Sequence, residues 1–271
     1  MEEAMFMINP EDVKNNAVAR GVNTEALEVP EFVILTFNRP IIGELTRLCN
    51  LKNWEWEASK YTPYSTPHTC LKGEFDEIGL AIFVPPMGAS PIAAFCEELI
   101  VYGARNIFLL CASWSLGDRY LEKGQIHVPS FAIGLDGTSY HYGNTKFRID
   151  AEPSTHSLLI EALKTGDANW KQGGVGCCEA FYRITHAMVD DYRKSGCLSI
   201  ENGEVAVLYS LASLRKIHVG VLLQPYIDLE RGLDLSYIDS RYPETCKVQA
   251  HIALKVLKKL YKLQANDTMT Q

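Results

Sequence analysis

The sequence predicts an α/β fold in which one domain is built around a central sheet. Short apolar segments rich in β-branched and aromatic residues recur along the chain, and segments of helical period lie between them. No change of composition marks a linker within the 271 residues. Buried strands joined by helices are typical of a mostly parallel sheet with helices on both faces. We therefore expect a single domain over residues 1–271.

The expected strands are apolar runs that end at turn-forming or polar residues. The first, Phe32–Phe37, reads FVILTF and stops before Asn-Arg-Pro. The second, Gly79–Val84, reads GLAIFV and is closed by two prolines. The later predicted strands are Asn106–Ala112, Gln125–Ile133, Val175–Cys178, Leu198–Ile200 and Ile217–Leu223.

The expected helices fill the intervals between these strands. In the best-marked one, Ser90 is a plausible N-cap, Pro91 occupies the first turn and Gly103 ends the helix. The other predicted helices are Ile41–Cys49, Ser154–Lys164, Thr185–Ser195, Glu204–Leu214 and Glu244–Leu263. Residues 1–28 are expected to form an N-terminal extension, and the polar residues 264–271 a frayed tail.

Composition excludes several classes of protein. The chain is 47% hydrophobic and 22% charged, which fits a globular protein and not a disordered one. A net charge of -7 argues against nucleic acid as the main partner. No apolar run approaches the about 20 residues of a membrane helix, and the acidic N-terminus does not resemble a secretory signal. Eight cysteines without a C-x-x-C pair favour a reduced, cytoplasmic protein with no metal site.

The first candidate site is the turn Pro85-Pro86-Met87-Gly88, which follows a strand and opens a helix. Ligands of open α/β sheets bind at such strand ends, and helix N-terminal amides attract anions. Taken alone, an ordinary strand-to-helix turn is the simpler interpretation.

A second candidate is the pair Glu201 and Glu204, which flank Asn202-Gly203 between a strand and an apolar helix. Buried carboxylates are costly unless they are paired, and one use for them is to accept hydrogen bonds from sugar hydroxyls. Capping of the helix that follows is an equally good interpretation.

Two aromatic segments are further candidates. Asp136–Tyr142, which contains His141, is either a binding loop or a turn packed by its own rings. Phe181 could stack on a flat base, with Arg183 beside it, although core packing next to a surface charge would give the same pattern.

Taken together and in this order, five segments resemble the nucleoside phosphorylase superfamily of the uridine phosphorylase and hexameric purine nucleoside phosphorylase type. They are PPMGASPIAAFCEELIVYGARNIFLL (Pro85–Leu110), KGQIHVP (Lys123–Pro129), DGTSYHY (Asp136–Tyr142), EAFYRIT (Glu179–Thr185) and GCLSIENGEVAVLYSLA (Gly196–Ala212). The resemblance extends from about Phe32 to Leu260. It implies a mixed, distorted barrel-like sheet flanked by helices, and assembly as an oligomer.

The resemblance also implies an activity, which is cleavage of the N-glycosidic bond of a nucleoside. Phosphate captures the sugar, or water does so in the related nucleosidases, and no other cofactor is implied. By the same resemblance, Met87 and Gly88 form the turn beside ribose and phosphate. Phe181 stacks on the base, and Glu201 and Glu204 hold the ribose hydroxyls.

Several positions depart from the family pattern. Asn202-Gly203 stands where the family has a single methionine between the two glutamates. The family's phosphate-binding arginines are replaced by Ile41 and Leu109, and Trp114 replaces a small residue. The nearest substitutes, by the resemblance, are Arg39 and Lys60 for phosphate, and Asp228, shifted by one residue, for the catalytic acid.

These departures leave two hypotheses. The first is a divergent enzyme that still cleaves a nucleoside-like substrate, with ordinary phosphorolysis weak or absent. The second is a catalytically silent member that binds a ligand or serves as a structural subunit. The expected assembly is a homo-oligomer, dimeric or hexameric, or a hetero-oligomer with an active paralogue.

Overall fold

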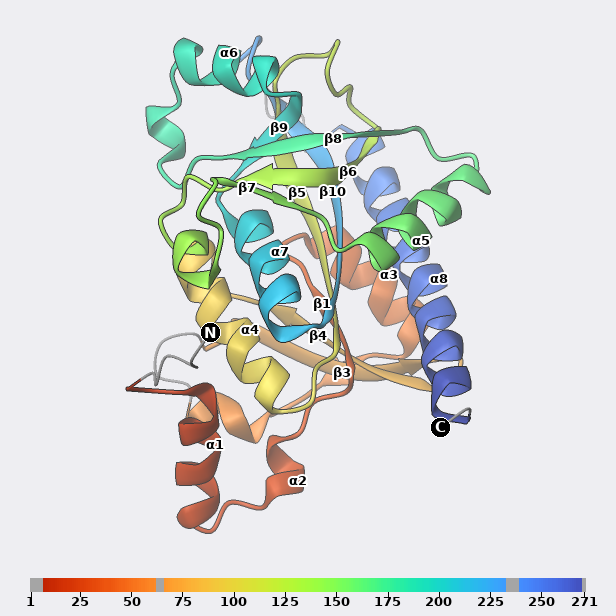
Figure 1. Ribbon diagram of the computed structural model, residues 1–271. Coiled ribbons are helices and arrows are strands. Elements are labelled where there is room, and N and C mark those ends of the chain that lie inside the picture. The colour runs from red at the N-terminus through yellow and green to blue at the C-terminus, as the bar shows by residue number, and fades with distance from the viewer. Residues whose placement is uncertain (1–6, 62–65, 233–238, 270–271) are drawn as a thin grey trace.

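The computed structural model describes residues 7–61, 66–232 and 239–269, whose strands belong to one mixed sheet (Figure 1). The strands are β1 (Phe32–Leu35), β2 (Lys52–Asn53), β3 (Thr69–Phe75), β4 (Ile78–Val84), β5 (Asn106–Ser115), β6 (Ile126–Ile133), β7 (Arg148–Asp150), β8 (Trp170–Cys177), β9 (Cys197–Glu201) and β10 (His218–Asp228). Their order is β10-β6-β8-β9-β5-β1-β4-β3-β2, and β7 pairs with β6.

Five strands close into a small barrel, because β10 pairs with β5 as well as with β6. The pairings β1–β4, β1–β5, β5–β10, β6–β8 and β8–β9 are parallel. The pairings β2–β3, β3–β4, β5–β9, β6–β7 and β6–β10 are antiparallel. The mixed, barrel-like sheet is therefore confirmed, and the mostly parallel sheet predicted from the strand pattern is wrong.

The strand β3 accounts for part of that error, since no strand was predicted there. It forms a hairpin with β4 through Asp76 and Glu77, which both have positive φ angles of 50° and 67°. Two-residue hairpin turns of this kind usually contain Asn or Gly. The acidic pair gave no such signal in the sequence.

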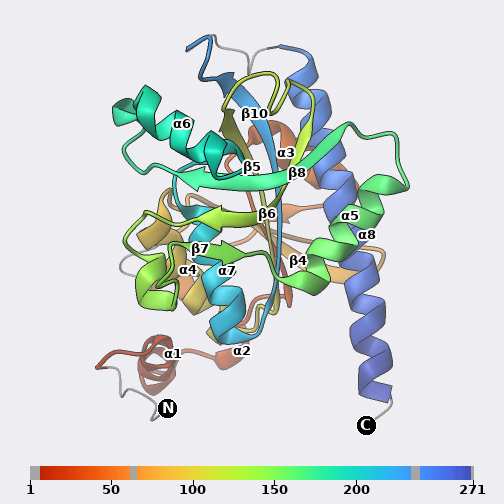
Figure 2. The ribbon, with the colours of Figure 1, turned by 45° about the horizontal axis from the view of Figure 1, so that its top comes forward.

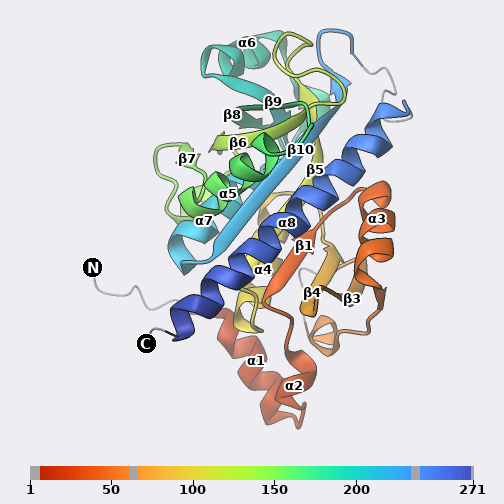
Figure 3. The same ribbon diagram turned by 90° about the vertical axis from the view of Figure 1, so that its right-hand side faces the viewer.

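Eight α-helices lie within the described residues. They are α1 (Pro10–Ala19), α2 (Thr24–Leu27), α3 (Arg39–Cys49), α4 (Ala89–Val101), α5 (Pro153–Lys164), α6 (His186–Lys194), α7 (Glu204–Arg215) and α8 (Arg241–Met269). Short 3-10 helices are η1 (Glu57–Lys60), η2 (Ser139–Tyr142) and η3 (Phe181–Arg183). Figure 3 shows α8 lying diagonally across the sheet between α3 and α5, against which it packs.

The described residues near both ends of the chain are more regular than the sequence predicts. The helix α8 continues to Met269, where a frayed tail was expected from Gln264. At the other end, α1 and α2 lie together at one end of the molecule (Figure 2). Ala17 and Leu27 are buried there, and the Leu27 carbonyl accepts a hydrogen bond of 2.8 Å from Trp56 Nε1. The N-terminal residues thus pack onto the domain.

Strands β5, β8 and β10 are longer than predicted. In β8 the glycines hid the strand, because glycine is depleted in strands. Glycine is needed there, since a Cβ on Gly174 would lie 2.2 Å from the ring of Phe131. In β10 the strand passes Pro225 through a bulge that shifts its register against β5. No helix of the described chain is long and apolar enough to cross a membrane.

Candidate functional site

A cavity of about 450 Å³ lies where β1, β5, β9 and β10 end. The parallel strands β1, β5 and β10 bring their carboxyl ends to the same edge of the sheet, which is where α/β folds bind ligands. The lining combines an apolar wall with carboxylates and amides. It consists of Phe37, Asn38, Arg39, Pro40, Met87, Leu109, Cys111, Ala112, Ser113, Trp114, Phe181, Ile200, Glu201, Asn202, Glu204, Leu223, Tyr226 and Tyr242.

The cavity brings together part of the predicted site. The predicted residues in its lining are Arg39, Met87, Phe181, Glu201 and Glu204. The predicted residues that are not in its lining are Lys60, Gly88, His141, Arg183 and Asp228.

Glu201 and Glu204 are both buried at the junction of β9 and α7. The Glu201 carboxylate accepts hydrogen bonds from the amides of Gly203, at 2.9 Å, and Val205, at 3.3 Å. Burial, followed by the adjacent Glu204 carboxylate, raises the pKa of Glu201 well above its ordinary value. Glu201 therefore caps α7, as one interpretation of the sequence had it, and also lines the cavity.

The turn between the two glutamates requires glycine. Gly203 has a φ of 97°, and a Cβ there would lie 2.8 Å from Cβ of Asp136 and 3.0 Å from Cys177 Sγ. Only glycine fits a position that combines this backbone conformation with so close a contact. The turn therefore holds the side chain of Asn202 in the cavity wall.

The loop that contains His141 is held by its own hydrogen bonds. The carboxylate of Asp136 accepts bonds from the Thr138 amide, the Ser139 amide and Ser139 Oγ, at 2.6–2.8 Å. His141 itself is exposed and lies edge-on to Tyr140. This geometry favours the packed turn over the binding loop.

The glycine turn ahead of α4 is occupied by carboxylates of the same chain. Glu204 Oε1 accepts a hydrogen bond of 2.9 Å from the Gly88 amide, and Glu179 Oε1 accepts one of 3.3 Å from the Ala89 amide. Burial raises the pKa of Glu179. The sequence gave no signal for this role of Glu179, which lies 90 positions from its partner.

An aromatic wall borders the cavity. The rings of Trp114 and Phe181 lie 5.2 Å apart with an interplanar angle of 55°, and Trp114 Nε1 donates a hydrogen bond of 2.7 Å to the Tyr226 hydroxyl. Tyr226 sits at the bulge of β10. Bulges re-aim side chains, which explains why Tyr226 was not identified from the sequence. Tyr242, in the first turn of α8, was not identified either.

Few cationic groups reach the cavity. Ile41 is fully buried in the core, and Leu109 presents an apolar side chain to the cavity. Arg39 is exposed and is the one cationic side chain among the described lining residues. The ammonium of Lys60 pairs with Glu57 at 2.6 Å. Within the ranges that the structure describes, no group of three or more His, Cys, Asp or Glu side chains is placed to hold a metal ion.

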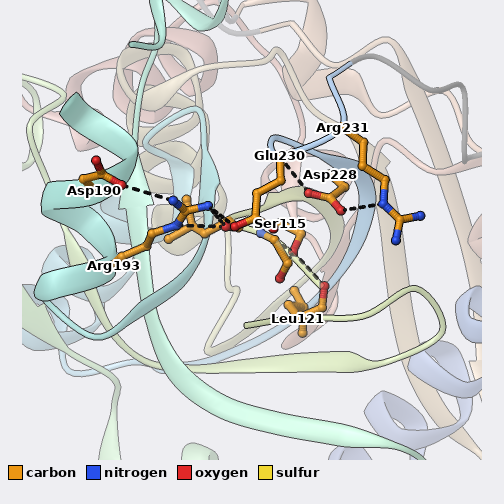
Figure 4. A network of polar contacts seen from close by, with 9 residues as sticks. Ser115, Leu121, Asp190, Arg193, Asp228, Glu230 and Arg231 are labelled. Carbon is orange, nitrogen blue, oxygen red and sulfur yellow. Dashed lines mark hydrogen bonds and ion pairs between the residues drawn. The ribbon is translucent and has the colours of Figure 1, made fainter. Parts of the chain in front are cut away.

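Asp228 belongs to a polar network at the end of β10 (Figure 4). Its Oδ1 accepts a hydrogen bond of 2.8 Å from the Glu230 amide, and its Oδ2 lies 3.4 Å from Arg231 Nε. Burial raises the pKa of Asp228. The carboxylate thus has two partners that do not belong to the cavity lining.

The same network ties β10 to α6. Arg193 Nε donates to the Leu116 carbonyl at 3.0 Å, and its two terminal nitrogens reach Glu230 at 2.6 Å and Asp190 at 3.1 Å (Figure 4). The Arg193 side chain is only 16% exposed. This arginine therefore links the end of one barrel strand to a surface helix.

Comparison with known proteins decides the family. The sequence model of the phosphorylase superfamily matches residues 32–226, which include the glycine turn, the aromatic segment and both glutamates. The chain belongs to the phosphorylase superfamily. The match also covers nine of the ten described strands entirely, and β10 as far as Tyr226.

Individual superfamily members are similar at low identity. A guanosine phosphorylase of Halorubrum lacusprofundi is 22% identical over 84% of this chain and 92% of its own length. The purine nucleoside phosphorylase of Toxoplasma gondii, solved with immucillin-H, has a TM-score of 0.75 at 17% identity, over 97% of this chain and 99% of its own. A uridine phosphorylase structure from Vibrio fischeri has a TM-score of 0.71 at 19% identity, over 86% and 93%. The two structures share the fold with this superfamily member.

Proposed function

We propose that this protein cleaves the N-glycosidic bond of a nucleoside or nucleoside-like substrate, and that phosphate is a poor acceptor for the sugar. One observation carries the proposal: Phe181 and the pair Glu201 and Glu204 line the same cavity of about 450 Å³. That volume lies in the range of small-molecule sites. The similarity to proteins named guanosine phosphorylase and uridine phosphorylase supports the class of substrate.

The carboxylates hold the sugar in this proposal. Glu204 accepts hydrogen bonds from its hydroxyls as an ionised group, which makes them about twice as strong as neutral ones, and Glu201 accepts them as a neutral carboxyl. The sugar becomes positively charged as the bond to the base breaks. Negative charge fixed beside it in a buried site stabilises that transition state.

The aromatic wall holds the base. Phe181 lines the cavity and is 41% exposed, and its ring lies 5.2 Å from that of Trp114. The base leaves with a proton. Asp228 stays a prediction as its donor, because that residue is not in the cavity lining. The roles of His141 and Arg183 likewise stay predictions.

The surroundings of the cavity disfavour phosphate. A bound dianion would meet one guanidinium, from Arg39, and the carboxyl groups of Glu201 and Glu204. The Gly88 and Ala89 amides, which would otherwise attract an anion, already donate to Glu204 and Glu179. Water is the acceptor that this environment accommodates. Its oxygen would bond to C1′ of the sugar as the C1′–N bond breaks and the base takes up the proton.

A second candidate is a silent superfamily member that binds a nucleoside or acts as a partner subunit. The internal capping of the Gly88 and Ala89 amides favours it, as does the bulky Trp114 in the cavity wall. Under either candidate we propose a cytoplasmic protein that assembles as a homo-oligomer, dimeric or hexameric, or with a paralogue. Neither candidate needs a cofactor beyond phosphate as an optional co-substrate.

Release of free base from a panel of purine and pyrimidine nucleosides, with and without phosphate, separates these candidates. We expect release without phosphate and little gain when it is added. A large gain with phosphate would contradict the proposed acceptor. Measurable nucleoside binding with no release under either condition would support the silent candidate.

A further inference from the structure

Asn202 lines the cavity between the two glutamates, and its Oδ1 is buried without a hydrogen-bond partner. Buried polar atoms nearly always have a partner, and leaving one unpaired costs about 1–3 kcal/mol. An exception in the wall of a ligand cavity has a simple explanation, which is that the ligand supplies the donor. The extra residue between the glutamates thus has a chemical use.

The backbone around Asn202 is fixed. Glu201 binds the amides of Gly203 and Val205, on the chain directly after Asn202, and Gly203 cannot be replaced without a clash. The amide side chain therefore starts from a rigid turn at the junction of β9 and α7. A rigid origin of this kind is what a residue that selects a ligand by hydrogen bonding requires.

The neighbouring acceptors are partly used. Both oxygens of Glu201 accept backbone amides, and Glu204 Oε1 accepts the Gly88 amide. Asn202 adds a neutral acceptor beside these two carboxyl groups. A carboxamide also carries two donors, so a hydroxyl, which both donates and accepts, can pair with it in either orientation.

We propose that Asn202 is a specificity-determining residue that hydrogen-bonds a sugar hydroxyl, so that the site selects ribonucleosides over deoxyribonucleosides. This inference rests on the proposed binding of a nucleoside in the cavity, and it does not require turnover. A site with a buried polar group rejects a ligand that lacks the matching hydroxyl, because the protein group is then left unpaired.

The test compares binding of a ribonucleoside with binding of its 2′-deoxy and 3′-deoxy analogues by calorimetry. We expect the parent to bind the ribonucleoside at least about tenfold more tightly than one of the analogues. Asn202→Ala should lower that ratio at least about threefold, the remainder coming from Glu201 and Glu204, and Asn202→Asp, which keeps an acceptor of the same shape, should retain most of the discrimination. The Tm of ligand-free Asn202→Ala should equal or exceed that of the parent, because the unpaired oxygen is gone.

The outcomes separate this inference from the proposed function. A parent that binds nucleosides but releases no base contradicts the proposed cleavage and leaves the role of Asn202 standing. An Asn202→Ala variant that discriminates between ribonucleoside and analogue as strongly as the parent overturns the role of Asn202 alone. A parent that binds no nucleoside overturns both, and this is seen before any variant is made.

Discussion

The carboxylate of Glu204 accepts a hydrogen bond of 2.9 Å from the backbone amide of Gly88, 116 positions earlier in the chain. This bond joins the start of α7 to the turn ahead of α4. A group that could hold a sugar is thereby anchored by the amide that could hold an anion. The start of α7 and the turn ahead of α4 are therefore coupled through one side chain.

Replacement of Glu204 separates its charge from its hydrogen bond. Glu204→Gln keeps an oxygen that can accept the Gly88 amide and removes the negative charge, so we expect a stable protein with nucleoside affinity about tenfold lower or more. Glu204→Ala also leaves that amide unpaired and should lower the free energy of unfolding by about 1–3 kcal/mol. Calorimetry and urea denaturation measure the two effects. Unchanged affinity in Glu204→Gln would remove this carboxylate from the site.

Glu201 makes the stability of the protein depend on pH. Its pKa in the folded chain lies well above the ordinary value of 4.5, because of burial and the Glu204 carboxylate. Its contribution to stability is present below pH 4.5 and is lost as the pH rises through the folded pKa. The stability of Glu201→Gln relative to the parent should therefore rise as the pH is raised from 5 to 8.5. A loss that does not depend on pH is also expected, because glutamine weakens one of the two contacts with backbone amides.

The exposed Glu74→Gln serves as the control for that series, and its difference from the parent should not change with pH. Urea denaturation at several pH values provides the measurement. A constant difference between Glu201→Gln and the parent over the whole range would show that Glu201 is not held in its neutral form by the fold.

The alternating helices and strands were predictable because most of them carry a local signal in the sequence. Apolar runs marked β1, β4 and β5, and Ser90 and Pro91 correctly indicated where α4 begins, to within two residues. Closure of the barrel was not predictable from such patterns. It depends on the contact of β10 with β5, which are more than 100 residues apart.

The site was predictable to the extent that its residues lie in continuous segments. Phe181, Glu201 and Glu204 were identified because they stand in strings that resemble a known superfamily, and the structure does bring them to one cavity. The contacts Glu179–Ala89 and Trp114–Tyr226 were missed, since each joins residues far apart in the chain. No periodicity or spacing reports a pair of this kind.

His127 should make the protein sensitive to acid. Its ring is fully buried in β6, with Nδ1 at 3.0 Å from Ser199 Oγ, and burial lowers its pKa from 6.5 to about 4. The unfolded chain therefore binds a proton between pH 6.5 and pH 4 that the folded chain does not. The contribution of His127 to stability falls as the pH falls through this window, by up to about 3 kcal/mol at its acid end.

The variant His127→Gln carries a donor and an acceptor but does not titrate in this window. Its unfolding free energy relative to that of the parent should rise as the pH falls from 7 to 4. The exposed His186→Gln should retain the acid sensitivity of the parent. Equal slopes for His127→Gln and the parent would contradict a neutral, buried His127.

Arg193 should be more important for stability than its neighbour Lys194. Arg193 is 16% exposed and holds the Leu116 carbonyl and Glu230, whereas Lys194 is 77% exposed and pairs with an exposed aspartate. Arg193→Ala should therefore lower the free energy of unfolding by about 1–3 kcal/mol, and Lys194→Ala by no more than about 0.5 kcal/mol. Urea denaturation of both variants checks this, and similar losses would mean that the link between β10 and α6 adds little.

Phe181 and Tyr182 offer a matched pair for testing how the base is held. The two rings lie 4.3 Å apart, but only Phe181 lines the cavity, and Tyr182 is 89% exposed. Stacking between a base and an aromatic ring contributes about 1–3 kcal/mol, which corresponds to a 5- to 150-fold change in affinity, roughly. Phe181→Ala should weaken nucleoside binding by that factor, while Tyr182→Ala changes it less than about threefold.

Because Trp114 lies 5.2 Å from Phe181, its fluorescence can report binding in both variants. Equal affinities for Phe181→Ala and the parent would mean that the base lies elsewhere in the cavity.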